Sequence, residues 1–178
     1  MAGSRGDERA WIRGAQSGSV PDLEALFRHH WPRAYRAAYL VVHDSAAAED
    51  IAQEAFLAAV RRLDRFDRRR PFGPWLHRIV VNRAIDWSRS RALRRETGDA
   101  WLGHIAAPPR AAGDHADTLA AALADLSPEH RAVIVMRHLL EYTPGEIAEA
   151  LGLPRGTVNS RLRRGLDELA SRLEEDLQ

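Results

Sequence analysis

The stretch TPGEIAEALGLPRGTVNSRLRRGL, residues 143–166, carries the signals that decide the fold of this chain. Thr143 and Glu146 are spaced as a capping box, in which the threonine hydroxyl accepts from the Glu146 amide and the glutamate carboxylate reaches back. A proline at the first helical position fits the same helix start. We therefore predict a short helix over residues 144–151. Gly152 permits a tight turn after it, and a second helix follows.

The apolar residues of this stretch fall where two helices packed at a steep angle must touch. The pattern is typical of a helix-turn-helix, in which the second helix enters the major groove of DNA. The predicted contact residues are Ile147, Leu151, Leu153, Val158 and Leu162.

The outward face of the second helix is basic and polar. Arginine pairs with guanine through two hydrogen bonds, asparagine pairs with adenine, and hydroxyl groups hold phosphates. The alternative is a helical hairpin with a solvated basic face, but a salt-bridged surface helix would mix signs, and residues 155–164 hold no acid. Arg161, nearer the inward face, is expected to touch phosphate or to pack. The predicted DNA-binding residues are Arg155, Thr157, Asn159, Ser160, Arg161, Arg163 and Arg164.

Outward from this motif, apolar residues recur at spacings of three and four, which predicts helices and no strands. Asp44, and Ser127 with the proline after it, are expected helix caps. Over residues 96–117 the helical period of the apolar residues fades, and the stretch is rich in Ala, Gly, Pro and Asp, which is typical of a linker. We predict an all-α chain of two small helical domains joined by a flexible linker. The predicted parts are an N-terminal extension at 1–20, a domain at 21–95, a linker at 96–117 and a domain at 118–178.

Charge is concentrated although the formal net charge is only +1. All 26 basic residues are arginine. Residues 61–95 hold 12 arginines against 3 acids, a net +9, and residues 155–164 hold 4 arginines and no acid, a net +4. Such basic segments attract a phosphate backbone, because each neutralised phosphate releases counterions. The alternative is that the protein simply uses arginine wherever its surface needs charge, and that the basic segments bind no specific partner.

Composition excludes several classes of protein. The chain of 178 residues has no cysteine, so disulfides, thiolate zinc sites and thiol catalysis are excluded. No apolar run is long enough for a membrane span or a leader peptide, which predicts a cytoplasmic protein without membrane insertion. The histidines and carboxylates form no cluster with metal-ligand or catalytic spacing, so we expect no cofactor, no metal and no enzymatic activity.

Two further segments give the chain a family resemblance. AEDIAQEAF at 48–56 resembles the core-polymerase-binding helix of the sigma-70 family of RNA polymerase initiation factors, and PWLHRIVVNRAIDWSRSR at 74–91 resembles its promoter-melting segment. The helix-turn-helix resembles the family's reader of the minus-thirty-five element. The order and separation match the extracytoplasmic-function (ECF) subgroup, which keeps only the second and fourth conserved regions. The resemblance therefore implies a region 2-like domain followed by a region 4-like domain.

The resemblance implies that Asp50, Gln53 and Glu54 contact the coiled-coil clamp of the largest subunit of core RNA polymerase. Together with Leu57 they follow the i, i+3, i+4, i+7 spacing of one helix face, so they can meet one partner. Without the resemblance, this face would be interpreted as an ordinary solvated surface. Phe56 is expected to lie in the core.

The resemblance implies that the predicted helix within residues 74–91, together with the arginine-rich loop before it, holds melted minus-ten DNA. Opening a duplex requires basic side chains for the displaced strand and flat rings for unstacked bases. Trp75 and Trp87 fit the apolar period, which favours a place in the core for both rings over a contact with bases. Asp86 is expected to pair locally with Arg83 or Arg89. The predicted residues are Arg68, Arg69, Arg70, Phe72, Trp75, Arg78, Asn82 and Arg83.

The alternative function is a stand-alone helix-turn-helix regulator that binds duplex DNA as a dimer, since such regulators usually recognise paired half-sites. It predicts tight DNA binding without polymerase. For the sigma factor, the expected partners are core RNA polymerase and promoter DNA, and the resemblance adds an anti-sigma protein. The minus-thirty-five helix departs from several relatives at Arg163, where they place an aromatic or apolar residue, so no promoter sequence is inferred.

Overall fold

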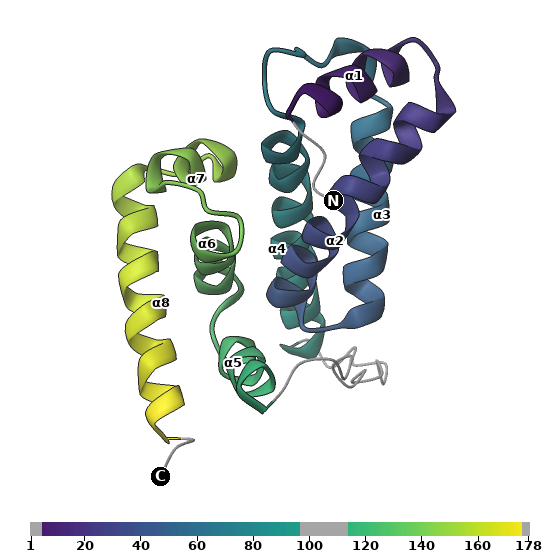
Figure 1. The fold of residues 1–178 in the computed structure, drawn as a ribbon. Coiled ribbons are helices and arrows are strands. Elements are labelled where there is room, and N and C mark those ends of the chain that lie inside the picture. The colour runs from purple at the N-terminus through teal and green to yellow at the C-terminus, as the bar shows by residue number, and fades with distance from the viewer. Residues whose placement is uncertain (1–4, 97–113, 176–178) are drawn as a thin grey trace.

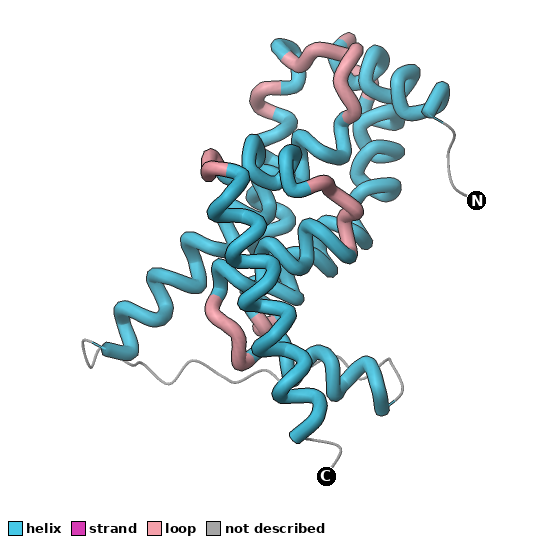
Figure 2. The backbone as a smooth tube through the Cα atoms, turned by 90° about the vertical axis from the view of Figure 1, so that its left-hand side faces the viewer, coloured by secondary structure: helices cyan, strands magenta, loops and turns pink. Residues whose placement is uncertain are grey.

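The computed structural model describes residues 5–96 and 114–175, and every regular element in these ranges is helical (Figures 1 and 2). The all-α prediction is confirmed. The predicted linker falls largely on residues 97–113, outside the described ranges. The elements are α1 (Arg5–Gln16), α2 (Val20–Val42), α3 (Ser45–Val60), the 3-10 turn η1 (Leu63–Arg65), α4 (Phe72–Glu96), α5 (Asp114–Ala124), α6 (Pro128–His138), α7 (Pro144–Leu151) and α8 (Arg155–Glu175).

The first group of helices, α1 to α4, packs around the apolar stripes of α2, α3 and α4. Ser19 caps α2 by accepting from the Asp22 amide, and Asp44 caps α3 by accepting from the Ala47 amide at 3.0 Å, as predicted for Asp44. Phe56 is buried, with 5% of its surface exposed, as expected. Most alanines of α2 and α3 are buried as well, and these small side chains let the two helix backbones approach closely.

Helix α1 was not predicted, because residues 1–20 were interpreted as an extension. Ile12 is buried in the core, and the Gln16 amide donates to the carbonyls of Leu63 and Phe66 at 2.8 and 3.0 Å. These bonds tie α1 to the turn between α3 and α4. The helix therefore belongs to the first group and fixes the start of the arginine-rich loop.

The second group, α5 to α8, has the predicted helix-turn-helix. The capping box of Thr143 and Glu146 is present: the Glu146 amide donates to the threonine hydroxyl, and the Thr143 amide donates to the Glu146 carboxylate at 2.8 Å. Gly152 adopts φ 65°, the left-handed conformation that the turn requires. Ile147 and Val158 are fully buried where α7 meets α8.

The two groups pack on each other, with α6 against α2 and α4 (Figure 1). A buried hydrogen bond of 2.9 Å joins His77 Nδ1 of α4 to the hydroxyl of Tyr142. The Arg33 guanidinium of α2 donates to the Leu139 carbonyl at 2.7 Å. Because these contacts join residues 65 and 106 positions apart, local sequence patterns do not predict them. No helix within the described residues is long and apolar enough to cross a membrane.

Candidate nucleic-acid interface

Helix α8 presents the predicted basic face to solvent from its first turn. Arg155, Asn159, Arg163 and Arg164 are exposed, and Thr157, Ser160 and Arg161 are partly buried. The buried residues Val158 and Leu162 lie between them in sequence and hold the opposite face on α6 and α7. The recognition face is therefore formed by a helix that the core fixes in place.

The charge on this face is not cancelled within α8. Among the residues that the structure describes, the ion pairs of the helix involve its later turns, where Glu168 contacts His130 and Arg172, and Arg172 contacts Asp125. Burial tends to raise the pKa of the Glu129 carboxyl, but the hydrogen bond with Arg89 and nearby positive charge lower it overall. Arg161 contributes part of that charge, so it lies near Glu129. This agrees with the expectation that Arg161 lies at the edge of the basic face. The remaining arginines are available to phosphates.

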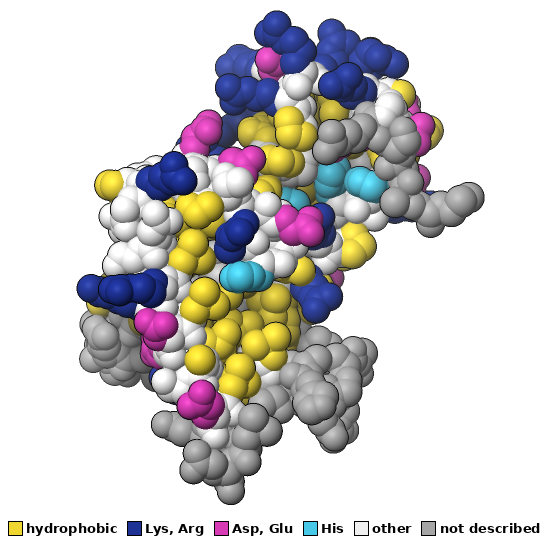
Figure 3. Space-filling view, turned by 60° about the vertical axis from the view of Figure 1, so that its left-hand side comes forward, with side chains coloured by type: hydrophobic (Ala, Val, Ile, Leu, Met, Phe, Trp, Pro, Cys, Tyr) yellow, Lys and Arg dark blue, Asp and Glu magenta, His cyan; other side chains and the backbone are white. Residues whose placement is uncertain are grey.

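A second basic surface lies at the α3–α4 end of the first group. Figure 3 shows basic side chains gathered at one end of the molecule, and Arg68, Arg69 and Arg70 are all exposed in the loop that precedes α4. The Arg69 guanidinium contacts Asp67 at 3.1 Å, and this hydrogen bond lowers the pKa of the Asp67 carboxyl. One loop acid is therefore matched to one arginine, and Arg68 and Arg70 add uncompensated charge.

A hollow of about 480 Å³ opens beside this loop, lined by Arg62, Arg65, Phe66, Asp67, Arg70 and Trp75. The Phe66 and Trp75 rings lie 4.7 Å apart and tilted at 34°. Trp75 is partly exposed, so an unstacked base could stack on its ring, whereas Phe66 is buried, with 9% of its surface exposed. Sequence analysis did not single out Phe66, whose only signal was its place inside the arginine run.

Phe72 does not fit its predicted role. It is 2% exposed and packs against Phe66 and Trp75, with ring centroids 5.7 and 5.6 Å away. Its ring stabilises the start of α4 and has no free face for a base. Phe72 is the first residue of α4, and its side chain is turned inward onto Phe66 and Trp75.

Asn82 and Arg83 are occupied by contacts within the protein. The Asn82 amide donates to the Arg78 carbonyl at 2.9 Å and to the Ala150 carbonyl of α7 at 3.2 Å. The Arg83 guanidinium forms an ion pair with Glu54 of α3. Arg89 pairs with Glu129 of α6 at 2.8 Å, so the expected local pairing of Asp86 with Arg83 or Arg89 is wrong.

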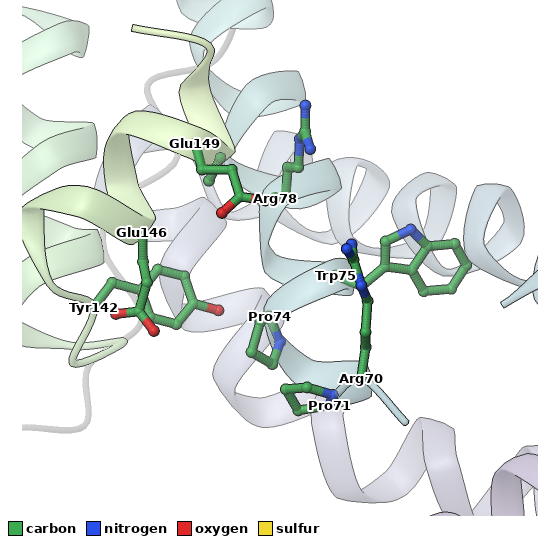
Figure 4. Close-up of a pocket in the computed structure, with 9 residues that line it drawn as sticks. Arg70, Pro71, Pro74, Trp75, Arg78, Tyr142, Glu146 and Glu149 are labelled. Atoms are coloured by element: carbon green, nitrogen blue, oxygen red, sulfur yellow. The ribbon is translucent and has the colours of Figure 1, made fainter. Parts of the chain in front are cut away.

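A cavity of about 240 Å³ separates the start of α4 from α7 (Figure 4). Arg70, Trp75 and Arg78 line one side, and Tyr142, Glu146 and Glu149 line the other. The acidic residues of α7 thus lie across from arginines that were predicted to hold DNA. In the packed arrangement this part of α4 is shared between the candidate DNA surface and the contact with the second group.

The predicted partner-binding face on α3 is exposed. Asp50, Gln53, Glu54 and Leu57 all point away from the core, and Leu57 has 55% of its surface exposed. The Gln53 amide donates to Glu49 at 3.2 Å, one turn earlier. The face therefore combines carboxylates with one accessible apolar side chain. Among the residues that the structure describes, no group of histidines and carboxylates is arranged to hold a metal ion.

Comparisons with known proteins place both halves of the chain. Residues 26–94 match the family model described as Sigma-70 region 2, and residues 116–169 match Sigma-70, region 4. The chain is 32% identical over 173 residues to ECF RNA polymerase sigma factor SigL of Mycobacterium tuberculosis, covering 93% of this chain and 97% of that protein. It is 30% identical over 158 residues to ECF RNA polymerase sigma factor SigW of Bacillus subtilis, covering 78% and 82%.

Two solved structures are similar to the fold. One is CnrH in complex with the cytosolic domain of CnrY, with a TM-score of 0.69 and 29% identity, covering 96% of this chain and 99% of that one. The other is the sigma factor RpoE in complex with the anti-sigma factor NepR from Bartonella quintana, with a TM-score of 0.71 and 23% identity, covering 87% and 98%. The second likeness concerns the fold alone.

Proposed function

The chain belongs to the ECF subgroup of the sigma-70 family of RNA polymerase initiation factors, and from this premise we propose how its own residues direct promoter-specific transcription initiation. The observation that carries the proposal is the joint occurrence of two basic surfaces, one on α8 and one at the start of α4, in the order of the two family regions. Members of this family are DNA-binding initiation factors rather than enzymes. We propose that the protein acts on DNA in the cytoplasm.

Helix α8 is proposed to occupy the major groove at the minus-thirty-five element. Arg155 and Asn159 lie in its first turns, where recognition helices contact base edges, and both are exposed. Arg163 and Arg164 lie two turns further on and are assigned to bases or phosphates at the groove edge. Thr157 and Ser160 add hydroxyl groups on the same face, and Arg161 contacts phosphate at its margin.

The loop before α4 is proposed to hold the melted minus-ten strand. Arg68, Arg69 and Arg70 supply charge for the sugar-phosphate backbone, and the partly exposed Trp75 supplies a ring for an unstacked base. The neighbouring hollow has room for such a base between the ring and the arginines. Phe72 is left out of this surface because it is buried.

The α3 face of Asp50, Gln53 and Glu54 is proposed to dock on the coiled-coil clamp of the largest polymerase subunit, as the family resemblance implies. Leu57 offers an exposed apolar side chain beside them, which a partner would bury. The ion pair of Glu54 with Arg83 links this face to α4. Docking on polymerase and placing α4 on DNA therefore depend on adjacent side chains.

Asn82 is proposed to contact DNA only after the two groups separate, and Arg78, although exposed, becomes accessible from the side of the cavity at the same time. Arg83 is proposed to contact DNA only after its ion pair with Glu54, within the first group, opens. Both amide protons of Asn82 are used by carbonyl groups in the packed arrangement, one of them on α7. Arg78 faces the cavity that α7 closes. Binding of the two groups to separate places on polymerase would uncover Asn82 and this side of Arg78, with each group held at high effective concentration near its DNA element.

Run-off transcription tests the proposal. Purified full-length protein is added to core RNA polymerase on a genomic fragment library and on a template with a pre-opened bubble. We expect specific transcripts with the protein and none without it. The dimeric-regulator alternative, which the matched region 2 does not favour, predicts instead selective duplex binding without polymerase. Inert polymerase on every template, the open bubble included, would refute the proposal.

An anti-sigma protein is the proposed inhibitory partner, by analogy with the relatives solved in complexes. An apolar groove between α2, α5, α6 and α8 is a suitable place, since Leu119 and Leu166 are 43% and 40% exposed beside it. Figure 3 shows apolar side chains gathered on the face below the basic end. Leu166→Asp should weaken capture of a co-expressed inhibitor without reducing run-off transcription, and unchanged capture would exclude this groove.

A further inference from the structure

A separate cavity of about 350 Å³ lies where the two groups of helices meet. It takes residues from four helices, and three of its polar side chains each have a buried atom that finds no hydrogen-bond partner among the described residues: His43 Nε2, Ser88 Oγ and Arg131 Nε. The lining residues used below are His43 at the end of α2, Trp87, Ser88 and Arg91 of α4, and Pro128 and Arg131 of α6. Trp87, Ser88 and Arg91 lie within residues 74–91, which resemble the promoter-melting segment, but none of these lining residues is assigned a DNA contact in the proposed function.

Arg131 is the central feature of this cavity. Only 8% of its surface is exposed, and its buried Nε has no hydrogen-bond partner in the described part of the chain. Across the described residues its side chain forms no ion pair, although burial lowers its pKa only to about 10, so it stays charged at neutral pH. A buried cation without a partner is costly, and proteins normally pair such a group. The arrangement therefore leaves a place for an anion.

The nearby carboxylates do not fill this place, because each is committed to another arginine. Arg91, which also stacks over the Trp87 ring, is one of those arginines. Asp125 and Glu129 act on Arg131 only through space, each tending to raise its pKa. The committed pairs are Asp44 with Arg91 at 3.0 Å, Glu129 with Arg89 at 2.8 Å, and Asp125 with Arg172 at 3.0 Å.

Two further polar atoms in the cavity lack partners. Ser88 is 7% exposed and its Oγ has no hydrogen bond. His43 has a buried Nε2 without a partner, and burial, together with the charge of Arg131, lowers its pKa to about 4, so the ring is neutral. The hydrogen bond of this ring with the Leu40 backbone uses its donor nitrogen, since it favours the protonated form. Nε2 is then an acceptor.

We propose that this cavity binds a small protonated oxyanion of the phosphate type, inorganic phosphate being the simplest case. Two of its oxygens accept from Arg131 Nε and from the Ser88 hydroxyl, and its P–OH donates to His43 Nε2. The first turn of α6, which starts at Pro128, adds a favourable dipole. Sulfate and simple carboxylates offer acceptor oxygens at neutral pH but no proton for His43, so they satisfy only part of the site.

A ligand at this site touches α2 and α4 on one side and α6 on the other. Such a ligand stabilises the packed arrangement of the two groups relative to the separated one. The stabilisation equals the difference between the ligand's binding free energies for the two arrangements. The site is independent of the proposed promoter contacts. Binding of phosphate and the loss of transcription activity are thus separate measurements.

The test uses the full-length chain and inorganic phosphate as the probe, with sodium chloride and sodium sulfate at equal ionic strength. Isothermal titration gives the dissociation constant, and thermal unfolding gives the midpoint with and without phosphate. We expect phosphate to raise the midpoint more than either comparison salt. A midpoint that phosphate raises no further than chloride would overturn the proposal, and equal binding of sulfate would overturn the role of His43 and with it the phosphate class.

Arg131→Met distinguishes a ligand site from a structural arginine. We expect at least about tenfold weaker phosphate binding, together with an unfolding midpoint in phosphate-free buffer that equals or exceeds that of the unaltered protein, because an unpaired buried charge has been removed. Ser88→Ala is a milder variant that removes one donor and should weaken binding about fivefold. Arg28→Met, at an exposed arginine on α2, is the matched control and should keep the full phosphate effect. Retention of that effect in Arg131→Met would overturn the proposal.

Discussion

Removing one phosphate-contacting arginine from α8 is expected to reduce the salt dependence of promoter binding by a fixed step. Arg155, Arg163 and Arg164 are exposed, and Arg161 is partly so. Each phosphate that an arginine neutralises contributes about 0.9 to the slope of log K against log salt concentration. If all four contact phosphates, α8 supplies a slope of about −3.6. Between 50 and 200 mM salt, each arginine then accounts for about a 3.5-fold loss of affinity.

The assay is fluorescence anisotropy of reconstituted holoenzyme on a promoter fragment found by run-off transcription, repeated over this salt range. Arg163→Ala and Arg164→Ala should each flatten the slope by about 0.9. Lysine variants separate the two kinds of contact. Arg163→Lys keeps the charge, so it should restore the slope, but it restores affinity only if the original contact is to phosphate, since lysine cannot form the paired bonds to guanine.

Arg28→Ala is the control, because this exposed arginine of α2 already pairs with Glu24 within its own helix. Its slope should equal that of the unaltered protein. Slopes that remain unchanged in both Arg163→Ala and Arg164→Ala would refute the assignment of α8 to the DNA backbone. A slope that flattens by much more than about 0.9 would mean that a substitution disturbs the whole helix-turn-helix and not one contact.

Further predictions concern polymerase, stability and pH. Alanine at Asp50, Gln53 and Glu54 together should abolish co-purification with core polymerase while leaving the thermal midpoint within a degree or two, and co-purification at the original level would contradict the proposed face. Thr143→Ala should lower the free energy of unfolding by about 1 kcal/mol in urea titrations, because the capping box loses its hydroxyl. Ser17→Ala is the comparison, since this exposed serine caps no helix start and its hydroxyl only donates to the Arg13 carbonyl at the end of α1. The pKa of His77 is lowered to about 3 by burial and that of His43 to about 4, whereas both lie near 6.5 in the unfolded chain, so the unfolded state binds more protons below pH 6.5. Stability should therefore fall as pH drops from about 6.5 towards 4, by up to about 1.4 kcal/mol per pH unit for each histidine, and His77→Gln should flatten this dependence.

The parts of the fold that the sequence predicted are those with local causes. The starts of α6 and α7 follow from Ser127 and Thr143, whose side chains cap amides three residues away, and the turn follows from Gly152. Helix α1 was missed because it has no such signal. What holds it is the packing of Ile12 and the bonds of Gln16 to carbonyls 47 and 50 residues away, which no local pattern contains.

The candidate site also has features that local sequence predicts and features that it does not. Charge could be predicted from composition, and the basic face of α8 is where the helical period places it. The partners of charged and polar residues could not be predicted, because Arg83 pairs 29 residues away and Asn82 bonds 68 residues away. Phe72 and Phe66 show the related difficulty for rings, since both are buried by contacts with each other and with Trp75 that local spacing does not specify.

The contact between α4 and α7 has a consequence for promoter binding. Asn82 has two amide protons, and both are used by carbonyls, so it cannot donate to a base while α7 stays in place. The two groups are held together by the apolar packing of α6 on α2 and α4 and by hydrogen bonds, each of which contributes only about 0.5–1.5 kcal/mol net. Separation therefore needs a partner whose affinity for the separated form exceeds that for the packed form by at least the free energy of the contact. Polymerase meets this condition if it binds the α3 face and the second group at distant places, whereas a ligand that bridges α4 and α6 acts in the opposite direction.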